Sequence, residues 1–219
     1  MARMSQHCHA HAPDASHPAY RRVLFIALVL NAAMFAVELA TGVASGSSAL
    51  LADALDFAGD AGNYALSLGA LLFMPALRPR VALFKGICMG VFGLLVLGAT
   101  GWHALQDTVP QAGTMSAVAV LALAVNLGVA AMLYRFRSGD ADMRSVWLCT
   151  RNDALVNMAV LVAAAGVLGS GSGWPDWLVA AVIAGLAFTS SLSVVRHARH
   201  EILDAACESE SSPGARTAP

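Results

Sequence analysis

Three aspartates interrupt an apolar run over residues 47–74 that is long enough to cross a bilayer. Asp53, Asp56, Asp60, Asn63 and Ser67 follow one another at spacings of 3, 4, 3 and 4 residues, which on an α-helix stack side chains along one face. A carboxylate in the hydrocarbon core is costly, so an ionisable stripe there points to a function. A structural polar cluster, or a helix of a soluble protein, is the alternative. The surrounding leucines disfavour it, because they leave no polar face wide enough for water.

Composition supports the membrane interpretation of this run. Of the 219 residues, 58% are hydrophobic and 12% are charged, whereas charged residues make up about 25% of soluble domains. The formal net charge is −1 and no basic run is present, so nucleic acid is not an expected partner. The four cysteines are scattered and suggest no disulfide framework. We therefore expect a multi-pass membrane protein with the lipid bilayer as its solvent.

The apolar runs predict an all-α integral membrane protein with six transmembrane helices. The membrane domain is expected over residues 23–203, between disordered cytoplasmic tails at 1–22 and 204–219. The helices themselves are predicted at about 23–44, 49–74, 81–106, 115–134, 145–168 and 176–195, with a tight turn over 45–48.

The distribution of basic residues predicts the orientation of these helices. With the N-terminus in the cytoplasm, 12 of the 13 Lys and Arg residues fall in cytoplasmic segments, and the last, Arg151, lies within the fifth helix. Such a bias places both termini in the cytoplasm. The twelve are Arg3, Arg21, Arg22, Arg78, Arg80, Lys85, Arg135, Arg137, Arg144, Arg196, Arg199 and Arg216.

A second polar stripe marks the fifth predicted helix. Ser145, Cys149, Asp153 and Asn157 follow at spacings of four residues, with Asn152 beside them. The second and fifth helices run in opposite directions in the predicted topology. At about 1.5 Å of rise per residue, both stripes reach a similar depth near the middle of the bilayer.

The two stripes together predict a metal site at the midplane. Asp56 and Asp60 from one helix, with Cys149 and Asp153 from the other, would supply four ligands, which suits a tetrahedral divalent ion. Carboxylates with one thiolate fit zinc, cadmium or cobalt better than calcium or magnesium. Without a metal, such a buried cluster would hold protons, so metal binding must displace them. We expect the metal to be a substrate exchanged for protons, with no permanently bound cofactor.

Further polar residues are candidates for secondary roles. Glu38 shares a face of the first helix with Asn31 and Thr41, and it could line a cavity or be a satisfied structural carboxylate. Asp53, Asn152 and Asn157 are secondary candidates beside the predicted metal site. The polar N-terminal tail could capture metal weakly or have no role; its candidate ligands are His7, Cys8, His9, His11 and His17.

Three motifs follow one another along the chain: Gly46-Ser-Ser-Ala-Leu-Leu-Ala-Asp-Ala, then Asp56-x-x-x-Asp60, then Cys149-x-x-x-Asp153. Together they resemble the cation diffusion facilitators. The resemblance covers about residues 20–203. It implies a six-helix, proton-coupled exporter of zinc and other divalent cations, and not an enzyme. By position, it assigns the metal site to Asp56, Asp60, Cys149 and Asp153, and Asn157 falls where the family often has asparagine. The expected location is a bacterial inner membrane.

Two departures from the family pattern bear on function. Cys149 stands where histidine is usual, so its membership of the site and the metal preference are open, with Asn152 as a weaker substitute ligand. The family's cytoplasmic metal-binding domain is not expected after Leu203. Because that domain normally supports dimerisation and sensing, a homodimer stays an open alternative. A membrane metal sensor or accessory protein without transport is the second functional hypothesis. A haem carrier is disfavoured, because the helices hold no paired core histidines.

Overall fold

The computed structural model describes residues 18–69, 78–136 and 141–211. Within the helices, the side chains of residues 78–79, 141–149, 151–152 and 204–211 lie outside the described part. The described residues form six α-helices and no strands: α1 (Pro18–Ser45), α2 (Ser48–Gly69), α3 (Arg78–Leu105), α4 (Ala112–Tyr134), α5 (Ala141–Ser170) and α6 (Trp174–Ser211).

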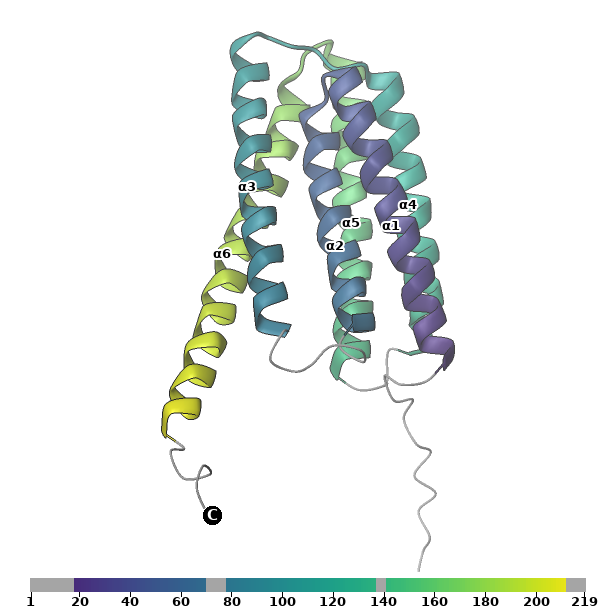
Figure 1. Ribbon diagram of the computed structural model, residues 1–219. Coiled ribbons are helices and arrows are strands. Elements are labelled where there is room, and N and C mark those ends of the chain that lie inside the picture. Colours follow the sequence, from purple (N-terminus) through teal and green to yellow (C-terminus); the bar gives the residue numbers. More distant parts are fainter. Residues whose placement is uncertain (1–17, 70–77, 137–140, 212–219) are drawn as a thin grey trace, which may run out of the picture.

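The helices stand side by side as one bundle, as Figure 1 shows. The α1–α2, α3–α4 and α5–α6 connections lie at one end, shown at the top, and the free ends of α1 and α6 lie at the other. We call the first the outer end, because the basic residues predict that it faces away from the cytoplasm. The most extensive contacts join α3 with α6, α1 with α2, and α4 with α5.

Helix α2 occupies the centre of the bundle, where it packs against α1, α3, α5 and α6. Most of its outer half is buried, from Ser48 to Leu55. A tight turn at Ser45–Ser47 joins it to α1, and Gly46 adopts the left-handed conformation there, with φ of +69°. The sequence places the acidic stripe on this helix, so the stripe lies inside the bundle.

Several polar side chains are buried in this bundle beside an apolar core, and many large apolar side chains face outward, unlike in a soluble protein. Glu38, Asp53, Asn126 and Asn157 are each 0–1% exposed. Among the described residues, large apolar side chains are exposed on every helix except α2, and most of them are leucine, valine, phenylalanine or isoleucine. This arrangement suits lipid as the surrounding medium, because a polar group facing hydrocarbon has no hydrogen-bonding partner.

Five of the described helices are long and apolar enough to cross a membrane, judged by length and composition: α1, α3, α4 and α6 over most of their length, and α5 over Asp153–Ser170. Helix α2 is the exception because it carries three aspartates within 22 residues. The prediction of an all-α membrane protein built from six helices is confirmed.

Several helix ends differ from the predicted ones. Helix α1 begins at Pro18, inside the predicted tail, because proline suits the first turn of a helix. Helix α5 begins at Ala141, so Asp142 and Arg144 belong to it rather than to a loop. Helix α6 continues to Ser211, past residue 195 and into the segment predicted to be a disordered tail, because no glycine or proline interrupts residues 196–211. The described part of α2 ends at Gly69, so residues 70–74 cannot be compared.

Candidate metal centre

The acidic stripe of α2 faces the interior of the bundle. Asp53 is fully buried, Asp60 is 5% exposed, and Asp56 between them is half-buried. Their spacing places them on the side of α2 that packs against α1 and α5. The helical interpretation of the stripe is therefore correct.

Asp153 on α5 is the point where the two predicted stripes meet. Asp153 is 5% exposed, and its carboxyl group lies within hydrogen-bonding reach of the Asp60 carboxyl. The Asp56 carboxyl lies within the same reach of Asp153. Asp153 Oδ2 is buried and receives no hydrogen bond from a donor group. Carboxylates this close repel one another unless a proton or a cation lies between them.

The remaining predicted ligands are only partly described. Cys149 lies on α5 one turn before Asp153, and Asn152 precedes Asp153, but both side chains fall outside the described part. Among the side chains that the structure describes, no three from His, Cys, Asp and Glu are gathered as a ready metal-binding group. The described part of the site therefore consists of two contacts between carboxyl groups, one of Asp153 with Asp60 and one of Asp153 with Asp56.

Asn157, the next polar residue of the α5 stripe, is fully buried. Its Nδ2 donates to the Asp153 main-chain oxygen at 2.9 Å, while its Oδ1 has no hydrogen-bonding partner. The amide thus bonds to its own helix and leaves an oxygen lone pair in the interior.

A second carboxyl pair joins α1 to α2. Glu38 and Asp53 are both fully buried and lie within hydrogen-bonding reach of each other. No donor group reaches any of their four carboxyl oxygens. Asp53 also interacts electrostatically with Asp56 and Asp153. The sequence identified both residues as candidates but gave no sign that they form a pair.

At the outer end, Asp176 caps α2 from across the bundle. This fully buried carboxylate at the start of α6 accepts hydrogen bonds from the Ser47 hydroxyl at 2.7 Å, from Ser48 N–H at 2.8 Å and from Ala49 N–H at 3.0 Å. The next free amide, that of Leu50, bonds to Ser47 Oγ at 3.1 Å. The first amides of α2 are therefore satisfied, and the negative charge lies at the positive end of the helix dipole.

Two more contacts tie α2 to its neighbours. Ser48 Oγ lies 2.8 Å from His103 Nδ1, which joins α3 to the start of α2. Toward the other end, Tyr64 OH lies 2.6 Å from Thr150 Oγ1 of α5. Sequence analysis missed the roles of Asp176, Tyr64 and Thr150, because each depends on a partner at least 86 residues away.

Lys85 lies near the end of α3 that the basic residues predict to face the cytoplasm. It lies within α3, and its Nζ donates a hydrogen bond to Asn63 Oδ1 on α2. Lysine has a long, flexible stem, so a charge near a helix end can turn inward as well as toward water. The candidate tail ligands His7, Cys8, His9, His11 and His17 lie outside the described residues.

One comparison with known proteins bears on this site. The family model for the cation efflux transmembrane domain matches residues 24–203, which is most of the chain. The match includes all six helices and the polar stripes of α2 and α5, with only the ends of α1 and α6 beyond it. Members of this family are membrane transporters and not enzymes in the usual sense. The chain belongs to the cation efflux family, whose transmembrane domain transports metal cations out of the cytoplasm.

Proposed function

We propose that this protein exports divalent metal from the cytoplasm in exchange for protons, with zinc as the leading substrate and cadmium or cobalt as further ones. The proposed location is a bacterial inner membrane. The observation that carries the proposal is the contact of Asp56 and Asp60 on α2 with Asp153 on α5. Three carboxyl groups share one buried region of an otherwise apolar bundle, so a cation or protons must offset their charge.

The proposed metal ligands are Asp56, Asp60, Cys149 and Asp153. The carboxylates supply the charge that makes a dehydrated divalent ion stable in a low-dielectric interior, and a Cys149 thiolate would complete a tetrahedral set. Each ligand must be deprotonated to bind, so loading the metal releases protons and loading protons releases the metal. That competition is a sufficient basis for antiport.

The experiment is metal uptake by proteoliposomes that contain the purified full chain under an imposed pH gradient. Asp60→Asn and Asp153→Asn keep the shape of the side chains and remove their charge, so flux should fall to the level of protein-free vesicles. Asp107→Asn is the matched control, because Asp107 is exposed near the outer turn between α3 and α4. Normal flux in both site variants would refute the proposal, and metal binding without flux in the wild type would favour the sensor hypothesis.

Cys149 distinguishes two versions of the site. If its sulfur is a ligand, Cys149→Ser should weaken cadmium transport more than zinc transport, because the softer ion loses more with the thiolate. Cys149→His should keep zinc transport. Unchanged apparent affinity for both metals in Cys149→Ala would instead leave a three-carboxylate site, completed by water or Asn152.

A further inference from the structure

Lys85 is a charged residue in an otherwise apolar part of α3. It lies seven residues from the start of the helix at Arg78, about 10 Å along the axis. Its neighbour Phe84 is 70% exposed on the outward face, whereas Lys85 is half-buried. A lysine at the edge of a membrane commonly extends toward the headgroups. Its half-buried position therefore needs an explanation from the interior.

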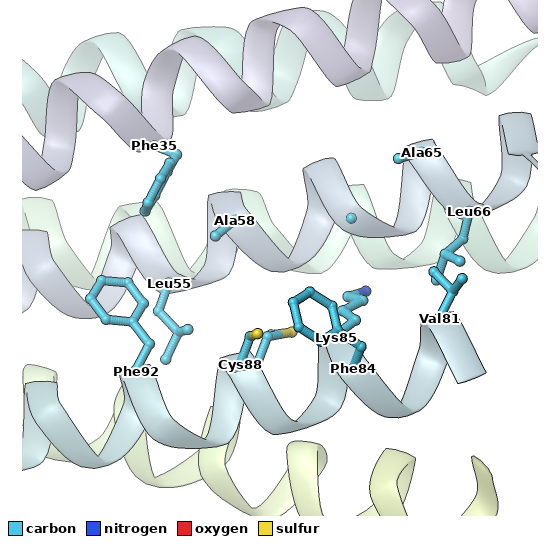
Figure 2. A pocket seen from close by; sticks show the side chains of 12 residues that line it. Phe35, Leu55, Ala58, Ala65, Leu66, Val81, Phe84, Lys85, Cys88 and Phe92 are labelled. Carbon is cyan, nitrogen blue, oxygen red and sulfur yellow. The ribbon is translucent and has the colours of Figure 1, made fainter. Parts of the chain in front are cut away.

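The side chain of Lys85 extends across to α2. Figure 2 shows its nitrogen on the side of α3 that faces α2. The Lys85 stem lies against the α2 backbone at Gly62, where an added Cβ would lie 2.9 Å from Lys85 Cε and 3.1 Å from Cδ. Nζ donates a hydrogen bond to Asn63 Oδ1. A residue without a side chain at position 62 thus makes room for the lysine.

The surroundings of this ammonium group are apolar. It borders a cavity of about 450 Å³ between α1, α2 and α3, and the other described residues that line the cavity carry no charge. Phe35, Leu55 and Phe92 form part of the wall (Figure 2). A charge in such a setting interacts more strongly with other charges than it would in water, because the effective dielectric constant is lower.

Asn63 belongs to the acidic stripe and follows Asp60 by three residues. Residues at this spacing are neighbours on a helix surface, with Cβ atoms about 5–6 Å apart. The ammonium group is therefore bound to the residue that follows Asp60 by about one turn of α2. It lies toward the C-terminal end of α2, from which a cytoplasmic cation would approach.

We propose that Lys85 is a tethered counter-cation for the acidic site, a role that rests on the proposed function. When no metal is bound, its charge offsets part of the negative charge at the Asp60 end of the site. When a divalent ion binds, the ammonium group repels it. Lys85 thereby lowers metal affinity and favours release, which a transporter needs as much as capture.

The test is the affinity of the detergent-purified full chain for zinc and for cadmium, measured by competition with a fluorescent chelator. Lys85→Gln and Lys85→Met remove the charge, and both should tighten binding by about tenfold or more, as expected for losing a like charge at this range. Lys85→Arg keeps the charge and should stay close to the wild type. Arg80→Gln is the matched control, because Arg80 is an exposed cation on the same helix.

The outcomes separate this role from the proposed function. Suppose that the wild type binds metal, and that Lys85→Gln and Lys85→Met elute as folded protein but bind metal no more tightly. That result would overturn the role of Lys85 alone. A wild type that binds neither metal would overturn the proposed function and this role together. Tighter binding in Lys85→Gln and in Arg80→Gln alike would assign the effect to net charge and would also overturn the role.

Discussion

The Asp176 cap gives a prediction whose size can be worked out from the structure. Asp176→Ala removes an acceptor of three hydrogen bonds and leaves the Ser47 hydroxyl and the amides of Ser48 and Ala49 without their partner. A hydrogen bond to a charged group contributes about 1.5–3 kcal/mol, and buried donors left unpaired add a cost of their own. Because these bonds share one carboxylate and are not additive, we expect a loss of about 4 kcal/mol of unfolding free energy.

That loss should be visible as a lower melting temperature. For a chain of this size, 1 kcal/mol corresponds to about 2–4 °C, so Tm should fall by about 8–16 °C. The assay is thermal unfolding of the purified full chain in detergent, followed by tryptophan fluorescence. Asp176→Asn keeps one acceptor oxygen but turns an amide toward a donor, so its Tm should lie between those of Asp176→Ala and the wild type.

Asp107→Asn is the control for a charge lost at the same end. Asp107 is exposed and has a φ of +49°, a conformation that asparagine also tolerates. We expect its Tm to match that of the wild type. If Asp176→Ala melted within about 2 °C of the wild type, the cap would contribute little, and the reasoning from buried unpaired donors would fail for this site.

Two further predictions concern packing and orientation. Gly173→Ala should destabilise the bundle and lower Tm, because the new Cβ would meet the Thr108 carbonyl oxygen and the Trp177 ring. Gly113→Ala is the control: its new Cβ meets nothing within 4 Å, so Tm should stay unchanged or rise slightly. Cysteines introduced at Gly113 and Ser172 should react with an impermeant thiol reagent applied to intact cells, and one at Ser138 should not. Labelling at Ser138 in sealed cells would reverse the predicted orientation.

The sequence by itself determined the architecture of this protein to a large extent. Six apolar segments, each long enough to span a bilayer, predict six helices, because hydrogen bonds within a helix are local and hydrocarbon permits few other structures. The 3–4 spacing of Asp53, Asp56 and Asp60 likewise predicted one acidic face. The helix ends were less accurate, because residues 196–211 have good helix propensity without the apolar character used to define a span.

Tertiary structure decided which of these groups meet. The pairing of Glu38 with Asp53, the capping of α2 by Asp176, and the extension of Lys85 toward Asn63 all join different helices. Helical periodicity assigns a side chain to a face of its own helix but does not specify which neighbour that face contacts, or at what depth. Those choices depend on the packing of the whole bundle, in which the buried polar groups of one helix must find partners on another.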